Sequence, residues 1–191
     1  MIVLIPMAGA GSRFAKEGYT IHKPAIPTTN LNTGEKVPMV VAATNDIPDI
    51  ANSKLVYIDR DFHKNDKVED EILKYYPNAN FITINYLTEG QASTCLLAKH
   101  IINTAEELFI AGCDNGMIYD LDKFKQLQQE CDVIVFTYRN NESVLLNPNA
   151  YGWVKVGENN NAIDVSVKKA ISDNPMKDNA IVASFWFKQG N

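Results

Sequence analysis

Short apolar runs alternate with amphipathic stretches over the first two thirds of the chain. The runs are rich in β-branched and aromatic residues, which is typical of buried strands. They cover residues 2–6, 54–59, 80–87, 107–114 and 132–138. The stretches between them repeat apolar positions at helical spacing, at residues 37–47, 67–76, 92–102 and 122–130. This alternation predicts a mostly parallel sheet with helices on both faces.

The last third of the chain has a different pattern. Residues 151–169 form two alternating stretches around an Asn-rich turn, which predicts a hairpin, and residues 180–187 predict a further strand. We therefore expect a β-rich C-terminal extension on one domain that spans residues 1–191. The chain stops four residues after the last predicted strand. We expect from this that the domain is truncated at its C-terminus.

Charge and cysteine content narrow the class of protein. The net charge is -5 and the isoelectric point is about 5.2, which argues against nucleic-acid binding. Any phosphate must then be held by local groups. The three cysteines show no metal-binding spacing, which favours reduced thiols. The chain shows no signal peptide and no apolar run of membrane-spanning length, so we expect a cytoplasmic protein without a membrane partner.

A glycine-rich loop, GAGSRF, follows the first predicted strand. Ligands of parallel sheets bind beyond the carboxyl ends of strands, so this is the right place for a site. The string is not a P-loop, because the chain contains no GxxxxGK[ST] motif. It is not a dinucleotide fingerprint either, because Phe14 stands where the fingerprint requires its third glycine. By itself it fits a strand-exit turn with a surface arginine as well as a phosphate loop. The Lys23-Pro24 pair that follows favours phosphate, since Lys and Arg13 both suit its oxygens.

The stretch AGAGSRF…KP resembles the signature of the sugar-phosphate nucleotidyltransferases, or sugar-nucleotide pyrophosphorylases. IPMAGAGSRF in particular resembles the small bacterial enzymes of capsule and lipopolysaccharide precursor synthesis, including cytidylyltransferases. The resemblance implies a Rossmann-like three-layer α/β/α sandwich with a mixed central sheet. It also implies that Arg13 steadies the leaving pyrophosphate and that Lys23 contacts the α-phosphate. The implied triphosphate loop consists of Met7, Ala8, Gly9, Ala10, Gly11 and Ser12.

Two later motifs extend the resemblance. TEGQAS follows the third predicted strand, and its free helix-start N–H groups fit either a simple helix cap or an electronegative ligand. In the family a matching stretch contacts the base and ribose, which implies this role for Glu89, Gly90 and Gln91. AGCDN ends a strand with a carboxylate. The family places a metal-binding aspartate there, so Asp114 is the expected ligand of Mg²⁺.

The β-rich extension carries the expected acceptor site. A Tyr-Gly pair borders the acceptor in the family, which implies Tyr151 and Gly152, although both also fit hairpin packing. A Glu-Lys pair often follows. Here Val167 replaces the glutamate, and Lys168 retains the charge for the acceptor phosphate, with Lys169 as the alternative. The family's second metal carboxylate lies in a strand beyond the last one of this sequence.

Together these motifs predict a nucleotidyltransferase. It would transfer a nucleoside monophosphate from a triphosphate, with CTP favoured, to a phosphorylated sugar or small head group, and release pyrophosphate. We expect a role in surface polysaccharide precursors and allow for a homo-oligomer. One alternative is a glycosyltransferase of similar fold, with D-x-D strings at residues 59–61 and 120–122. The other is a non-catalytic nucleotide-binding domain.

Overall fold

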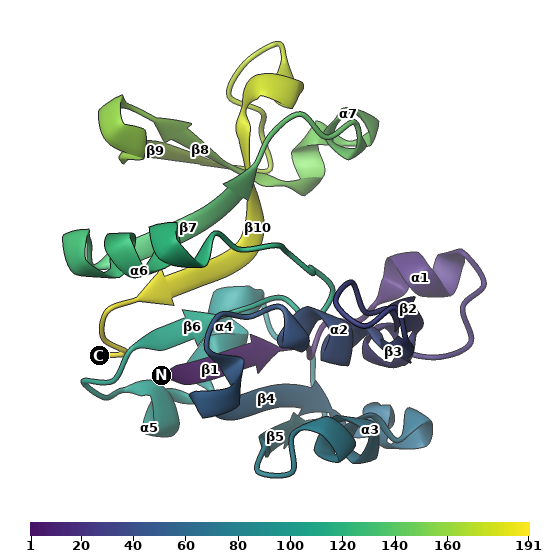
Figure 1. Ribbon diagram of the computed structural model, residues 1–191. Coiled ribbons are helices and arrows are strands. Elements are labelled where there is room, and N and C mark those ends of the chain that lie inside the picture. Colours follow the sequence, from purple (N-terminus) through teal and green to yellow (C-terminus); the bar gives the residue numbers. More distant parts are fainter. The chain divides into compact units, whose positions relative to one another are not determined.

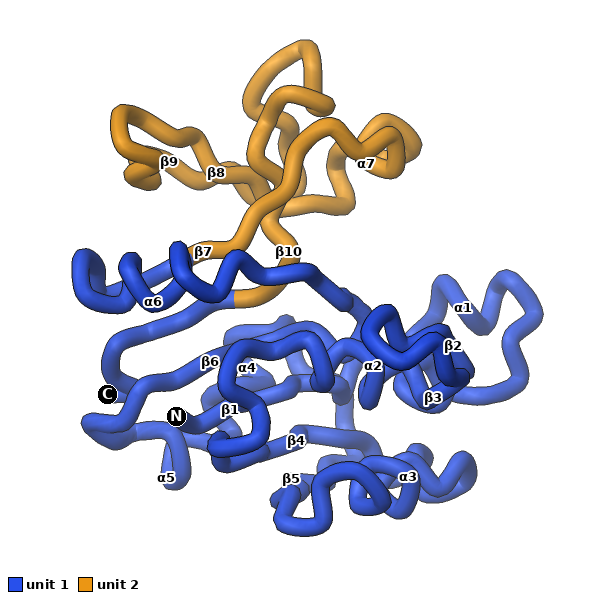
Figure 2. The backbone as a smooth tube through the Cα atoms, in the orientation of Figure 1, with its two compact units in different colours: residues 1–134, 185–191 blue, residues 135–184 orange.

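The computed structural model describes residues 1–191 and divides into two compact units (Figure 2). Unit 1 comprises Met1–Ile134 and Phe185–Asn191, and unit 2 comprises Val135–Ser184. The chain thus leaves unit 1 once and returns to it once. It does so through two strands, β7 (Val133–Tyr138) and β10 (Asn179–Phe187), each of which has residues in both units.

Unit 1 is built on a sheet of mainly parallel strands (Figure 1). Its strands are β1 (Ile2–Pro6), β4 (Lys54–Arg60), β5 (Asn80–Ile84) and β6 (Leu108–Ile110). They lie in the order β5-β4-β1-β6, all parallel, and the end of β10 adds to β6 as an antiparallel strand. The expected mixed, mostly parallel sheet is therefore confirmed. Its carboxyl edge is formed by the loops that follow β1, β4, β5 and β6.

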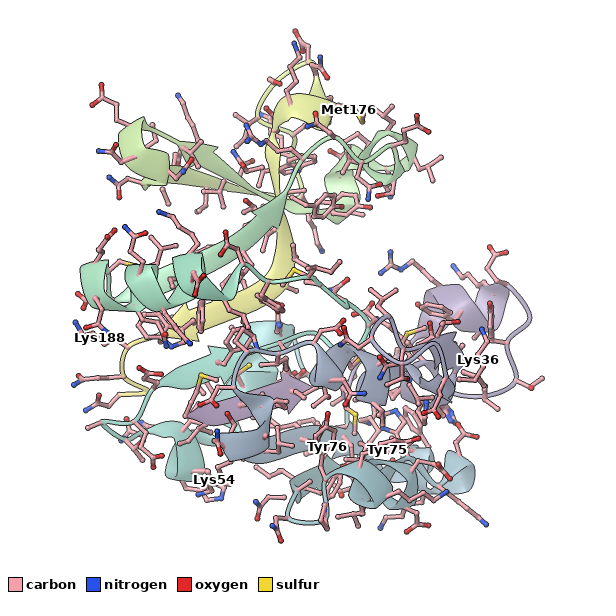
Figure 3. All side chains as sticks on the ribbon, in the orientation of Figure 1. Lys36, Lys54, Tyr75, Tyr76, Met176 and Lys188 are labelled. Carbon is pink, nitrogen blue, oxygen red and sulfur yellow. The ribbon has the colours of Figure 1, made fainter.

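One face of this sheet is covered by α2 (Met39–Asn45), α3 (Val68–Tyr75) and α6 (Leu121–Glu130). The hydroxyl of Thr44 in α2 shares a hydrogen bond of 3.2 Å with the hydroxyl of Tyr57, whose side chain extends from β4 toward this helix. Tyr76, directly after α3, donates its hydroxyl to Asn45 at the end of α2 (Figure 3). Side-chain hydrogen bonds therefore fix α2 both to the sheet and to α3.

The opposite face is covered by α4 (Gln91–Leu96) and α5 (Lys99–Ile102). Ala98 and Ile102 pack there against Leu4 and Val56, in a cluster with almost no exposed surface. Helices on both faces confirm the three-layer sandwich. No helix of the structure is both long enough and apolar enough to span a bilayer.

Two predicted elements of unit 1 differ in detail from the structure. The helix expected over 92–102 is split into α4 and α5, because Leu97 and Ala98 bond to carbonyls three residues back and tighten the turn. The strand expected over 107–114 ends at Ile110. Ala111 still donates to Leu4 at 3.0 Å, and the chain then leaves the sheet at Gly112. Asp114 therefore lies on the loop after the strand.

Short elements complete unit 1 near the glycine loop. They are α1 (Ser12–Lys16), a 3₁₀ helix (Lys23–Ala25), the hairpin of β2 (Pro27–Thr29) and β3 (Lys36–Pro38), and a second 3₁₀ helix (Asp61–Asp66). The hydrophobic pattern did not predict them, since none has enough residues to show a period.

Unit 2 contains the predicted hairpin. Strands β8 (Gly152–Val156) and β9 (Ala162–Val167) are antiparallel, and the first residues of β10 pair with β8. The helix α7 (Ser143–Leu146) precedes them. Trp153, Ala180 and Val144 form the small core of this unit. The β-rich extension is confirmed in its secondary structure.

One carboxyl group is buried in the sheet of unit 1. Asp59, near the end of β4, is fully excluded from solvent. Neither carboxyl oxygen has a hydrogen bond of good geometry, although the Thr83 hydroxyl and the Glu69 carboxyl lie close enough to affect its charge. The pKa of Asp59 is raised to about 6, mainly by loss of hydration; a hydrogen bond from Thr83 opposes the shift, and the nearby Glu69 adds to it. Ionisation of Asp59 therefore lowers the free energy of unfolding.

Candidate functional site

The glycine loop leaves β1 at the carboxyl edge of the sheet. The N–H of Met7 donates to the carbonyl of Ile58 at 2.8 Å, and Met7 and Ala8 are buried. Beyond this anchor the loop is open to solvent, and the backbone N–H groups of residues 9–13 donate no hydrogen bond within the protein. A row of available N–H groups in a glycine-rich loop suits the oxygens of a phosphate chain.

Gly11 brings this loop next to the Lys-Pro segment. Its backbone has a φ of +62°, which favours glycine, and its carbonyl accepts from Phe14 at the start of α1. A Cβ at Gly11 would lie 3.7 Å from Cβ of Lys23. Arg13 projects from α1 as an exposed residue. The structure therefore brings the glycine loop and Lys23 together, as the sequence predicted, and leaves Arg13 accessible to a ligand.

Lys23 forms an ion pair with Asp114. Its ammonium group contacts Oδ2 of Asp114, and the two side chains are 20% and 29% exposed. The same ammonium lies 5.8 Å from the centre of the Phe14 ring. Residues from three separate segments, the glycine loop, the Lys-Pro pair and the loop after β6, thus meet at the carboxyl edge of the sheet. A partly buried pair of this kind is worth more than one in open water.

The loop that carries Asp114 is fixed by a second carboxylate. Asp46, at the end of α2, accepts from the N–H of Met117 and from the Asn32 amide at 3.3 Å. Burial raises the pKa of Asp46, and these two donors oppose the shift. A Cβ at Gly116 would lie only 2.7 Å from Oδ2 of Asp46, so a larger residue there would require the Asp46 carboxylate to shift. Sequence reasoning missed Asp46, because its partners lie far away along the chain.

The surroundings of Asp114 are compatible with Mg²⁺. No group of three or more His, Cys, Asp or Glu side chains is arranged to hold a metal ion by itself, but Mg²⁺ is commonly held by one or two carboxylates plus substrate phosphates. The carboxylate of Asp114 is already paired with a positive charge, the ammonium group of Lys23. Burial raises the pKa of the neighbouring Cys113 to about 11, which keeps its thiol neutral and unsuited as a ligand. Asp114 thus remains the candidate ligand.

The predicted base-binding segment lies before α4. Glu89 and Gly90 are exposed, and Gln91 is the first residue of the helix. The carbonyl of Gly90 accepts from both the N–H and the hydroxyl of Thr94, each at 3.0 Å, which fixes the helix start. α4 belongs to the same hydrophobic cluster as Ala8 of the glycine loop. The role of these residues in base binding stays a prediction.

The three predicted acceptor residues lie together in unit 2. The N–H of Lys168 donates to the carbonyl of Tyr151 at 2.9 Å, and Lys168 is exposed with a φ of +57°. The ring of Tyr151 packs against Trp153, and a Cβ at Gly152 would lie 3.1 Å from Ile181. These contacts explain the Tyr-Gly pair through packing. Acceptor binding by these residues stays a prediction.

Comparison with solved structures identifies the fold. A protein assigned as a glucose-1-phosphate thymidylyltransferase from Bacillus anthracis, solved with sucrose, matches with a TM-score of 0.71 and 16% identity over 100% of this chain and 72% of that one. UDP-glucose pyrophosphorylase complexed with UDP-glucose gives 0.67 and 17% over 98% and 76%. The inositol-1-phosphate CTP transferase from T. maritima gives 0.63 and 14% over 97% and 69%. The chain has the fold of the sugar-phosphate nucleotidyltransferases. No protein-family model matches the sequence, and no curated protein matches it.

Within this nucleotidyltransferase fold, one contact next to Lys23 was not expected. The sequence suggested no role for His22 and gave no sign of a partner. In the structure, Asp66 binds both its backbone N–H and its imidazole. The two residues are 44 positions apart, and only their arrangement in space reveals the contact.

Proposed function

We propose that the chain is a nucleotidyltransferase that acts on a pyrimidine nucleoside triphosphate and a phosphorylated sugar or small head group. An oxygen of the acceptor phosphate attacks the α-phosphorus in line. The bond from this phosphorus to the bridging oxygen of the β-phosphate breaks, and pyrophosphate leaves with the electron pair. No covalent intermediate with the protein is needed, so catalysis rests on positioning and on charge.

The residues of unit 1 divide this work. The N–H groups of residues 9–13 bind the triphosphate, and Arg13 stabilises the leaving pyrophosphate. Lys23 exchanges Asp114 for the α-phosphate, where charge develops during the reaction. Asp114 would hold Mg²⁺, and the bound ion would supply neutralisation of phosphate charge. Binding of the base by residues 89–91, and of the acceptor by the Tyr151, Gly152 and Lys168 group of unit 2, belongs to the same proposal.

The observation that carries the proposal is the contact between Lys23 and Asp114 beside an open glycine loop. The three structural neighbours are named for thymidylyl, UDP and CTP chemistry, all of it with pyrimidine nucleotides. This supports the pyrimidine class. The resemblance of the glycine loop adds the preference for CTP and the role in surface polysaccharide precursors. The cytoplasmic location is proposed from the sequence, which shows no signal peptide and no apolar run of membrane-spanning length.

A pyrophosphate-release assay tests the activity. CTP, UTP, dTTP, ATP and GTP are each combined with Mg²⁺ and a panel of hexose 1-phosphates, inositol 1-phosphate and phosphocholine. We expect release with at least one pyrimidine triphosphate, dependent on the acceptor. The absence of release with every pair would refute the proposal.

Lys23→Ala tests whether the site carries the reaction. We expect turnover to fall by about 100-fold or more, as for loss of one preorganised charged group. The free energy of unfolding should change by only about 1 kcal/mol, since the pair is partly exposed. Equal losses of activity and stability would indicate a structural role. Lys16→Ala, which removes an exposed lysine of α1, is the matched control.

The rival functions fit the structure less well. Asp59 of the first D-x-D string is fully buried, and Asp120 of the second caps α6 by accepting from the N–H of Lys123 at 2.9 Å. Neither string is therefore arranged as a metal motif for a glycosyltransferase. A non-catalytic domain would bind triphosphate by calorimetry but release no pyrophosphate in the assay above.

A further inference from the structure

The backbone in front of Lys23 is held by a single carboxylate. Oδ2 of Asp66 accepts from the N–H of His22 at 2.7 Å and lies 2.5 Å from Nδ1 of the same residue. The side chain of Asp66 is only 14% exposed, so water competes little for these contacts. Both bonds converge on one residue, and the next residue in the chain is Lys23.

The imidazole of His22 is fixed by packing as well. It lies 4.5 Å from the ring of Phe62, at an interplanar angle of 31°, and 5.7 Å from the ring of His63. His63 is buried, and burial lowers its pKa to about 4, with repulsion from His22 as the second cause. His63 is thus neutral near pH 7. Phe62 and His63 belong to the same 3₁₀ helix as Asp66, Asp61–Asp66, so one element provides the whole receptor for His22.

The chain after Lys23 is also fixed. Pro24 is buried, and the N–H of Ala25 donates to the carbonyl of His22 at 2.9 Å. The N–H of Met39 donates to the carbonyl of Ile26 at 2.8 Å. Lys23 thus extends from a backbone that is tied down on both sides. On the His22 side the tie is the carboxylate of Asp66.

We propose that Asp66 is a positioning residue: it holds His22 and thereby sets the place from which Lys23 reaches the α-phosphate. The inference rests on the proposed function for its kinetic consequence, but the anchor itself is a property of the free protein. A lysine side chain that must leave Asp114 and contact a phosphate reaches it reproducibly only if its backbone is held in one place. A displacement of about 1 Å at a reacting centre can cost on the order of 100-fold in rate.

Two substitutions at Asp66 separate its contacts. Asp66→Ala removes the acceptor for both the N–H and the imidazole. Asp66→Asn keeps a carbonyl oxygen for the N–H and loses the negative charge. We expect Asp66→Ala to lower kcat by about 10- to 100-fold with little change in the KM for the triphosphate, and Asp66→Asn to recover part of the loss. Asp70→Ala, an exposed carboxylate on α3, is the matched control and should leave kcat unchanged.

A double-mutant cycle shows whether Asp66 acts through Lys23. If it does, Asp66→Ala costs little more than about 2-fold when it is added to Lys23→Ala, because the group it positions is already absent. An equal fold-loss in both backgrounds would overturn the inference, since a general loss of structure would lower both rates alike. Melting temperatures of all variants are measured alongside.

Amide exchange gives a readout that needs no activity. We expect the His22 N–H to exchange at least about tenfold faster in Asp66→Ala, with a smaller change in Asp66→Asn and none in Asp70→Ala. Unchanged exchange in Asp66→Ala overturns the inference. If the wild-type protein releases no pyrophosphate with any pair, the proposed function fails. The anchor is then decided by exchange alone: faster exchange in Asp66→Ala supports it.

Discussion

Substitution of the buried Asp59 by asparagine should change how stability depends on pH. The folded protein raises the pKa of this carboxyl to about 6, from an ordinary value of 3.8, mainly through desolvation. The neutral form is therefore favoured in the fold. The stability from this group is fully present below about pH 4, is lost as pH rises to about 6, and stays lost above that. At about 1.4 kcal/mol per pKa unit, the total loss is about 3 kcal/mol.

The assay compares urea unfolding of wild type and Asp59→Asn at pH 4.5 and pH 8, followed by the fluorescence of the buried tryptophans. At pH 4.5 the protein has already lost the part of this stability that corresponds to about three quarters of a pKa unit. The loss of stability still to come between pH 4.5 and pH 8 is therefore about 2 kcal/mol. Wild type should lose this amount relative to the variant on going from pH 4.5 to pH 8. Any fixed cost of burying the asparagine amide cancels, because it is the same at both pH values.

Asp70→Asn is the control, since it removes an exposed carboxyl from the helix that faces Asp59. It should not reproduce the pH-dependent difference. If the stability difference between wild type and Asp59→Asn is the same at both pH values, Asp59 is not buried in the way described. The reasoning from desolvation would then be wrong.

Three further predictions follow from the site. Gly116→Ala should lower the free energy of unfolding in urea by about 1 kcal/mol, because its Cβ would lie 2.7 Å from Oδ2 of Asp46 and move this carboxylate away from the donors Met117 and Asn32. Gly9→Ala is the control and should not change stability, because a Cβ at Gly9 would have no atom within 4 Å. Equal effects of the Gly116 and Gly9 substitutions would contradict the close contact at Gly116. Cys113, whose pKa burial raises to about 11, should resist iodoacetamide at pH 8 in the native protein and react in urea; rapid native modification would contradict its burial. EDTA should abolish pyrophosphate release and excess Mg²⁺ should restore it, whereas release that persists in EDTA would exclude a metal at Asp114.

The sequence predicted the layers of the fold well, because the buried strands form continuous apolar runs and the longer helices repeat apolar positions at helical spacing. The run at residues 2–6 and the strand β1 have the same bounds, and α3 begins and ends within a residue of the predicted 67–76. The errors lie where tertiary contacts set the ends of elements. The strand after residue 107 ends at Ile110, and the chain bends at Cys113 and Asp114 in the loop that follows, where a Cβ at Gly112 would lie 3.0 Å from the side-chain amide of Asn115. No local pattern of apolar residues encodes such a turn.

Only part of the candidate site was predictable from the sequence, namely the residues proposed to act on the triphosphate. Glycines, Arg13, Lys23 and Asp114 stand in an order that resembles a known family, and the structure brings Lys23 to Asp114. The groups that hold them in place could not be found. Asp66 and Asp46 are ordinary acidic residues in the sequence, and their roles arise from contacts across 44 and 71 positions.

The path of the chain between its two units has an engineering consequence. Unit 2 is an insertion: the chain leaves unit 1 after Ile134 and re-enters it at Phe185, through strands β7 and β10 that pair with each other. Exit and return points that share a strand pair can be joined by a short hairpin. Residues 135–184 of a relative can therefore replace those of this chain in a chimera, while the proposed triphosphate site of unit 1 stays unchanged. If unit 2 determines which acceptor is bound, as proposed, such a chimera would have the acceptor specificity of the relative.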